Sequence, residues 1–314
     1  MPDKRLLWLG SGLVAATALY LLWGLGGRVW FILELRGIKL AGLVLVGIAV
    51  AFATVLFQTL SGNRILTPAI MGFDALFLLV QASLVLSLGG FGYAQLPSVL
   101  LFGVNSGAMM WASVLLFAAV LHRARHDIQL MILVGVVFGL MFRSLTSFIQ
   151  RLIAPSEFAM IQGAMFAQFS GINRVELRAA SLLLLMVLIW LWPRMAVLDV
   201  VALGRAPARS LGLDYDRVQM QMLCVIAALV SVSTALVGPI TFLGLLVASL
   251  THTLMRTHRH ALLLPASALI AAIILVSGQA VFERVLRMQS TLTVVIEFVG
   301  GLLFLYLLAR GKLR

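Results

Sequence analysis

Residues 193–217 read PRMAVLDVVALGRAPARSLGLDYDR and separate two strongly apolar stretches of the chain. This segment holds the longest cluster of charges in a sequence that is otherwise apolar, and charged side chains are rarely buried. Its charged residues are Arg194, Asp199, Arg205, Arg209, Asp214, Asp216 and Arg217. The segment is therefore predicted to be a water-facing loop, and the rest of the chain is organised around it.

Two short helices are predicted inside this segment, over residues 198–203 and 206–211. Pro207 stands near the first turn of the second helix, and Gly212 follows as its stop signal. Helices of two turns are marginal alone in water and need a surface to pack on. We therefore expect the segment to bind another protein, the alternative being an exposed loop that merely joins two spans.

The composition indicates an integral membrane protein. The chain has 314 residues, of which 62% are hydrophobic and 11% charged, and its mean hydropathy is +1.10. A formal net charge of +12 would suggest a nucleic-acid partner in a soluble protein, but basic cytoplasmic loops explain it here. The single cysteine, Cys224, excludes a disulfide within the chain.

Ten apolar stretches are long enough to be candidate transmembrane helices, so the predicted fold is all-α, in one polytopic domain over residues 1–314. The first begins like a signal peptide, but its length indicates an uncleaved helix. A further segment, 157–169, is too short to cross and indicates a re-entrant or surface helix. The ten stretches are 6–25, 39–60, 68–88, 96–121, 128–148, 177–192, 218–237, 240–254, 261–282 and 291–309.

Basic clusters set the expected orientation. HRARH at 122–126, RTHRH at 256–260 and ARGKLR at 309–314 all fall on one side if the ten spans alternate in direction. The positive-inside rule assigns that side to the cytoplasm. Both termini and the segment 193–217 are therefore predicted to be cytoplasmic.

Asp74, Arg143 and Glu297 are charged residues inside apolar runs, which makes them candidates for lining a substrate pathway. Each has an alternative. Arg143 can snorkel to the headgroups from near the outer end of its span, and both carboxylates lie within a turn or two of a span end, where water reaches them. In the same span as Arg143, Gly135 and Gly139 form a GxxxG pattern, which permits close helix contact or reflects ordinary packing.

The sequence contains no pattern that is specific for a catalytic or metal-binding site. The histidines lack the acidic or cysteine partners of a metal site and are expected to be solvated loop residues. Ser106-Gly107 and Ser170-Gly171 resemble the Ser-Gly of intramembrane serine proteases, but a two-residue pattern is unspecific and no histidine pairs with either. No GxxxxGK[ST] phosphate loop is present, so energy from ATP would come from a partner chain.

Two motifs carry a resemblance to a known family. Residues 208–212 read ARSLG and residues 237–245 read VGPITFLGL, which is similar to the signature of the FecCD permeases of bacterial ABC importers for ferric siderophores, haem and cobalamin. Residues 58–72, 258–265 and 300–308 agree with that family in order and spacing.

The sequence also departs from the usual family pattern. Residues 63–68 read NRILTP instead of Asn-Pro-Leu-Ala-Asp-Pro, and residues 36–39 read RGIK instead of Arg-x-Pro-Arg. Ala248-Ser249 replaces Pro-His, and Glu297 stands where the family is usually small or apolar. This pattern resembles the subgroup that works beside a second, different permease in ferric-catecholate uptake, such as that of vibriobactin and enterobactin.

The resemblance implies the type II permease fold of ABC importers in the bacterial inner membrane. It also implies a second FecCD-type permease, expected to be a different chain, two ATPase subunits that bind the ATP, and a periplasmic siderophore-binding protein. The chain itself is expected to bind no cofactor or metal and no nucleic acid, and to catalyse no reaction. Haem or cobalamin is the alternative substrate.

The resemblance further assigns residues to two contacts. Segment 193–217, hereafter the coupling loop, would meet the ATPases through Ala208, Arg209, Ser210, Leu211 and Gly212. On the outside, Arg36 and Lys39 match residue for residue the family positions that receive glutamates of the binding protein. A second docking position falls at Arg284 or Arg287, since the match there holds only to within a position or two. The alternative for all four is a set of ordinary headgroup anchors.

Overall fold

The computed structural model describes residues 2–24, 29–123, 128–285 and 292–309, and none of these forms a β-strand. The prediction of an all-α membrane fold is confirmed. Eight helices are long and apolar enough to cross a membrane, and α11 and α13 add shorter apolar stretches. The eight long helices are α1 (Pro2–Leu22), α2 (Val29–Ser61), α3 (Phe73–Ala94), α4 (Ser98–Arg123), α5 (Ile128–Leu152), α7 (Arg174–Leu191), α10 (Tyr215–Val237) and α12 (His260–Arg284). The two shorter ones are α11 (Leu243–Met255) and α13 (Leu292–Ala309).

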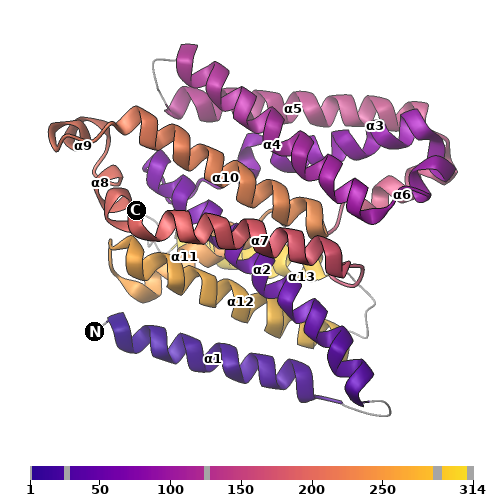
Figure 1. Ribbon diagram of the computed structural model, residues 1–314, viewed down its shortest axis with the longest axis horizontal. Helices are drawn as coiled ribbons and strands as arrows, with labels where there is room; N and C mark the ends of the chain where they lie inside the picture. Colours follow the sequence, from indigo (N-terminus) through magenta and orange to yellow (C-terminus); the bar gives the residue numbers. More distant parts are fainter. Residues whose placement is uncertain (1, 25–28, 124–127, 286–291, 310–314) are drawn as a thin grey trace.

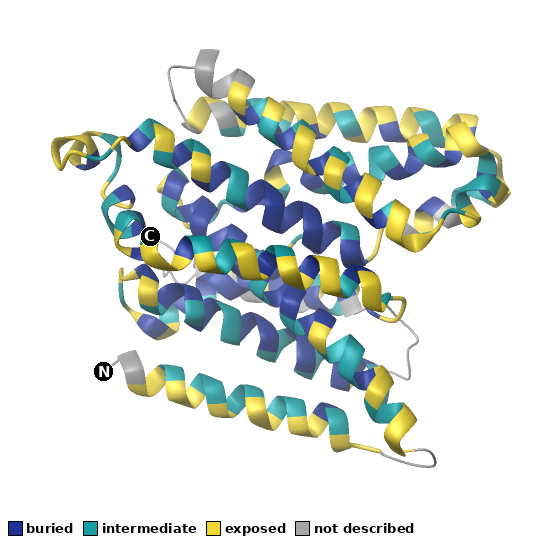
Figure 2. Ribbon diagram, in the orientation of Figure 1, coloured by how far each residue is buried: buried dark blue, intermediate teal, exposed yellow. Residues whose placement is uncertain are grey.

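Helix α2 forms the centre of the bundle and packs against α12, α10, α11 and α7. Figure 2 shows the buried residues concentrated in this central layer. Small residues along α2 permit this packing: a Cβ built on Gly47 would lie 3.3 Å from backbone atoms of both Ala271 and Ala272. Small residues let helices approach closely in a membrane. The contact between α2 and α12 is the most extensive helix–helix contact among the described residues.

The short helices lie at the two ends of the bundle (Figure 1). Helices α8 (Met195–Val201) and α9 (Arg205–Ser210) lie at one end, and α6 (Pro155–Ala164) lies at the other. Arg5 donates a hydrogen bond to the Leu254 carbonyl, so α1 begins at the same end as α8 and α9. We call this the loop end and the opposite one the outer end; residues 310–314 lie outside the described residues.

Helix α3 begins deep inside the bundle, which differs from the expected third span over residues 68–88. The chain enters through the 3₁₀ turn η1 (Pro68–Met71) and Gly72, whose φ is +88°. A Cβ on Gly72 would lie 2.5 Å from the Cα of Gly139, and one on Gly135 would lie 3.0 Å from Met71. Gly135 and Gly139 of α5 therefore form the surface against which η1 packs. Because Gly139 lies near the middle of α5, Asp74, in the first turn of α3, lies at mid-depth.

Candidate functional site

The coupling loop folds into two short helices, as the sequence predicts. Helix α9 is preceded by Gly204, with φ +93°, and is followed by Leu211 and then by Gly212, with φ +84°. The Gly212 N–H donates to the Arg209 carbonyl (2.9 Å) and the Leu213 N–H to the Ala208 carbonyl (3.1 Å). This pair of bonds is the Schellman arrangement that closes a helix at a left-handed glycine. Gly212 is therefore the stop that its position in the sequence indicates.

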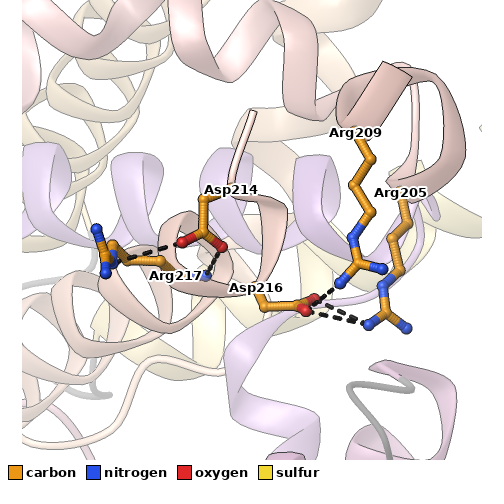
Figure 3. Close-up of polar contacts among 5 residues, drawn as sticks. All are labelled: Arg205, Arg209, Asp214, Asp216 and Arg217. Carbon is orange, nitrogen blue, oxygen red and sulfur yellow. Dashed lines mark hydrogen bonds and ion pairs between the residues drawn. The ribbon is translucent and has the colours of Figure 1, made fainter. Parts of the chain in front are cut away.

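Helix α9 is held against the start of α10 by one carboxylate (Figure 3). Asp216 pairs with Arg205 at 3.0 Å and also with Arg209, so two turns of the loop converge on one residue of α10. Asp214 caps α10 by accepting from the backbone N–H of Arg217 (3.3 Å). Carboxylates are favoured at the N-terminus of a helix, so the acidic pair Asp214 and Asp216 stabilises both the helix start and the loop.

Helix α8 is held against the core by a second carboxylate. Asp199 accepts from the backbone N–H of His260 at 2.8 Å, and the same oxygen lies 2.6 Å from Nδ1 of that imidazole. Nε2 of His260 lies 2.7 Å from the hydroxyl of Thr59, near the end of α2. The Thr59 hydroxyl already lies 2.8 Å from the Val55 carbonyl, to which it donates, so the imidazole is the donor to Thr59.

This arrangement links three elements through one buried side chain. His260 is 2% exposed and begins α12, Thr59 belongs to α2, and Asp199 belongs to α8. The expectation that the histidines are solvated loop residues is wrong for His260. Its partners lie 61 and 201 positions away, a distance over which sequence patterns give no signal.

The predicted contact residues of the coupling loop divide into two groups. Ala208 is fully buried and its methyl group packs inside the loop, whereas Arg209 is exposed. Ser210, Leu211 and Gly212 are exposed, with Leu211 66% exposed. Leu203, between the two short helices, is 59% exposed. The loop end thus presents two apolar side chains on a rigid, ion-paired base.

The predicted docking residues on the outer side differ in accessibility. Arg36 is only 8% exposed, and its guanidinium donates to the carbonyls of Tyr20, Leu21, Trp23 and Gly24 at 2.6 to 3.5 Å. The assignment of Arg36 as a docking residue stays a prediction, for a side chain that is largely buried against the end of α1. The carbonyls at the end of α1 have no partner within their own helix, and a basic side chain stabilises such a C-terminus.

The other three predicted docking positions are Lys39 and Arg284, which are partly exposed, and Arg287. Lys39 pairs with Glu283 at 3.1 Å. Arg284 is half-buried and donates to the Gly24 carbonyl at 3.5 Å, beside Arg36. Arg287 lies outside the described residues.

Two of the three intramembrane charges, Asp74 and Glu297, lie beside the hydroxyl group of Thr241, and the third, Arg143, is near Asp74. Thr241, in the turn between α10 and α11, donates to Asp74 at 3.3 Å, and the Glu297 carboxylate comes within reach of the same hydroxyl. Arg143 acts electrostatically on Asp74. Arg143 lies nine residues before Leu152, about 13 Å along the helix axis. It is therefore deeper than the span-end position expected of a snorkelling residue.

Asp74 and Thr241 also line a small cavity of about 30 Å³, whose wall includes residues of α2 and α10. Within the described residues, no group of three histidine, cysteine, aspartate or glutamate side chains is placed to hold a metal ion. The cluster places charged side chains at mid-depth, where such residues are rare and costly in membrane proteins.

Comparisons with known proteins agree along nearly the whole chain. The model of the FecCD transport family matches residues 13–310. The petrobactin import system permease protein YclO of Bacillus subtilis (strain 168) is 42% identical over 298 residues, which cover 95% of this chain and 94% of that protein. The vitamin B12 import system permease protein BtuC of Vibrio cholerae serotype O1 is 28% identical over 284 residues, covering 90% and 83%.

The fold has a close counterpart among solved structures. A structure described as an inward-facing conformation of a metal-chelate type ABC transporter superposes with a TM-score of 0.84. The identity is 19%, and the match covers 98% of this chain and 99% of the other. The type II permease fold expected from the sequence is therefore confirmed.

Proposed function

Because the chain belongs to the FecCD transport family, we propose that it is the membrane-spanning permease of an ATP-driven importer for a ferric siderophore. The observation that carries this proposal is the family match over residues 13–310, which includes both the coupling loop and the intramembrane charges. The chain has no phosphate loop of its own. ATP is therefore bound and hydrolysed by two partner subunits, and the chain contributes movement rather than catalysis.

The substrate we propose is a ferric catecholate carried across the bacterial inner membrane. A relative 42% identical to this chain is named for petrobactin, which makes ferric petrobactin the first chelate to test, ahead of vibriobactin and enterobactin. The relative named for vitamin B12 is 28% identical, so cobalamin, with haem, is the second candidate. Affinity and selectivity would reside mainly in a periplasmic binding protein.

Transmission of force is assigned to the coupling loop. Leu203 and Leu211 project from the loop end and are suited to an apolar groove on an ATPase. The base beneath them is tied to α10 through Asp216, and to α12 and α2 through Asp199 and His260. A displacement of α8 and α9 would therefore move three core helices together, which fits rocking of the spans around a central pathway.

A second permease is proposed to cover the face that carries Arg143. This guanidinium is exposed on α5 near mid-depth, and a charge facing lipid tails is strongly disfavoured. A pathway between two permeases would hydrate it and would also reach Asp74 and Glu297. The departures from the family pattern at residues 63–68 and 248–249 favour a different chain over a copy.

Docking of the binding protein is proposed at the outer end, around Lys39 and Arg284, with Arg287 as a further candidate. Lys39 has a nearby acidic partner in Glu283, while Arg284 makes only a weak bond to a carbonyl and is free to receive a carboxylate. Exposed ion pairs are individually weak, but several together steer association and fix orientation.

Uptake measurements test the proposed substrate. Cells lacking this chain would be supplied with radiolabelled iron as the petrobactin, enterobactin or vibriobactin complex, with labelled haem, or with labelled cobalamin. Restoration of one ferric-catecholate uptake by the wild-type chain supports the proposal. Restoration of haem or cobalamin uptake alone would replace it. Native mass spectrometry of the affinity-purified complex would show whether the second permease is a different chain.

A further inference from the structure

A second cavity, separate from the intramembrane charge cluster, opens between α3, α4, α7 and α10. Its volume is about 390 Å³. It lies toward the outer end, because it is lined by Ser98 at the start of α4, by Glu176 in the first turn of α7 and by Val237 at the end of α10. The polar side chains in its wall are Gln81, Tyr93, Ser98, Asn105, Gln168 and Glu176.

Two oxygen atoms in this wall accept no hydrogen bond. They are Oε1 of Glu176 and Oδ1 of Asn105, and both side chains are buried, at 6% and 3% exposure. The neighbouring polar groups are already used. The Tyr93 hydroxyl donates to Gln81 at 2.6 Å, and the Gln168 amide donates to the Gly163 carbonyl at 3.0 Å.

The charge of Glu176 is also uncompensated. None of the described residues lining the cavity is basic. Arg174 is paired with Glu34, and Arg178 is exposed on the same helix without a bond to Glu176. Glu176 lies in the first turn of α7, where the helix dipole attracts negative charge. However, a buried carboxylate is stable only with a partner that neutralises it or donates to it.

We infer that this cavity binds a monovalent cation, with Glu176 and Asn105 as its ligands. The two orphan atoms are a carboxylate oxygen and an amide oxygen, which are the donors that hard cations and ammonium groups prefer. A single carboxylate balances a single positive charge. Asn105 belongs to α4 and Glu176 to α7, so the bound cation would join these two helices at the outer end. The inference is independent of the transported substrate.

Thermal stability measured against cation concentration tests this inference. The full chain, with the subunits that copurify, would be placed in nanodiscs in N-methyl-D-glucamine chloride. Sodium, potassium or methylammonium chloride would then replace that salt at constant ionic strength. We expect Tm to rise and saturate, because a ligand that binds only the folded state stabilises it. A rise with sodium or potassium alone identifies an inorganic ion, and a rise with methylammonium identifies an amine site.

Two variants assign the effect to the cavity. Glu176→Gln keeps the shape of the side chain and removes its charge, so the response of Tm to cations is expected to disappear. Glu157→Gln is the matched control. Glu157 also lies at the outer end, but its carboxylate is satisfied by the Gly90 N–H at 2.6 Å and does not line the cavity, so the response is expected to persist.

Clear outcomes would overturn the inference. One is a wild-type Tm that is the same in all the salts, which would mean that the carboxyl group is neutral. Another is an equal cation response in Glu176→Gln. If Glu176→Gln fails to fold, the inference is tested with Asn105→Leu instead. The binding of radioactive sodium to this variant would be compared with its binding to the wild type. We expect Asn105→Leu to need about tenfold more cation, the factor equivalent to losing ~1.4 kcal/mol of binding free energy. Unchanged affinity in Asn105→Leu would contradict the assigned ligands.

Discussion

Nδ1 of His260 lies 2.6 Å from Oδ1 of Asp199, and this contact fastens the coupling loop to the membrane core. The same oxygen accepts the backbone N–H of His260, so Asp199 caps α12 from a different part of the chain. The opposite edge of the imidazole reaches Thr59 of α2. One side chain thus joins the loop to the two most closely packed helices of the bundle.

Replacing Asp199 with alanine is expected to destabilise the loop end and to impair transport. The substitution leaves the backbone N–H of His260 without its acceptor and Nδ1 of the imidazole without its partner, and a buried unsatisfied polar group costs about 1–3 kcal/mol. Chemical denaturation and ATP-dependent uptake would measure the two effects. Glu34→Ala is the control, because its pair with Arg174 is exposed and contributes under about 1 kcal/mol. Equal stability and uptake in the two variants would remove Asp199 from the coupling path.

Gly72→Ala is expected to disrupt the entry of α3. The added Cβ would lie 2.5 Å from the Cα of Gly139, and the residue has φ +88°, so both space and backbone conformation oppose it. Overpacking of this kind costs typically about 1–3 kcal/mol. Thermal unfolding in detergent would measure the loss. Gly103→Ala in α4 is the control, since its Cβ meets nothing within 4 Å. Comparable Tm values for the two variants would count against the close packing of η1 on α5.

Cysteine labelling tests whether Glu297 faces a water-filled pathway. Cys224 would first be replaced by alanine, leaving a cysteine at position 297 as the sole thiol. Because Glu297 gathers with Asp74 around Thr241, we expect a membrane-impermeant thiol reagent to modify it in at least one nucleotide state of the importer. A matched cysteine at Leu185, exposed on the apolar surface of α7, should not react. Complete protection of position 297 in every nucleotide state would exclude the pathway assignment.

Charge reversal at Arg284 is expected to slow docking of the binding protein. Losing a rim charge mainly lowers the association rate and its dependence on salt. Surface plasmon resonance over a range of ionic strengths would measure both, with a several-fold slower association expected at low salt for Arg284→Glu. Arg151→Glu, at the outer end of α5, is the control for general charge. If Arg284→Glu associates as fast as the wild type at every ionic strength, docking lies elsewhere.

Local signals in the sequence were sufficient to predict the long apolar helices and the end of α9 before Gly212. Hydropathy and the position of a glycine can both be read from a short stretch of neighbouring residues. Contacts between distant residues were not accessible in this way. Arg36 resembles an exposed basic residue until the end of α1 folds onto it. Asp74 resembles a residue at a membrane edge until η1 carries it to mid-depth. His260 and Glu176 acquire their roles only from helices that lie far away along the chain.

ATP-driven uptake by proteoliposomes containing Leu211→Asp tests the central claim most directly. Leu211 is 66% exposed in the chain, so the substitution should leave folding and insertion intact. In an apolar groove of an ATPase, however, the unpaired charge would cost about a few kcal/mol. We expect weaker copurification of the ATPases and loss of ferric-chelate uptake, whereas the volume-conserving Leu211→Met retains both. Wild-type ATPase binding and wild-type uptake by Leu211→Asp would contradict the assignment of this loop as the coupling surface.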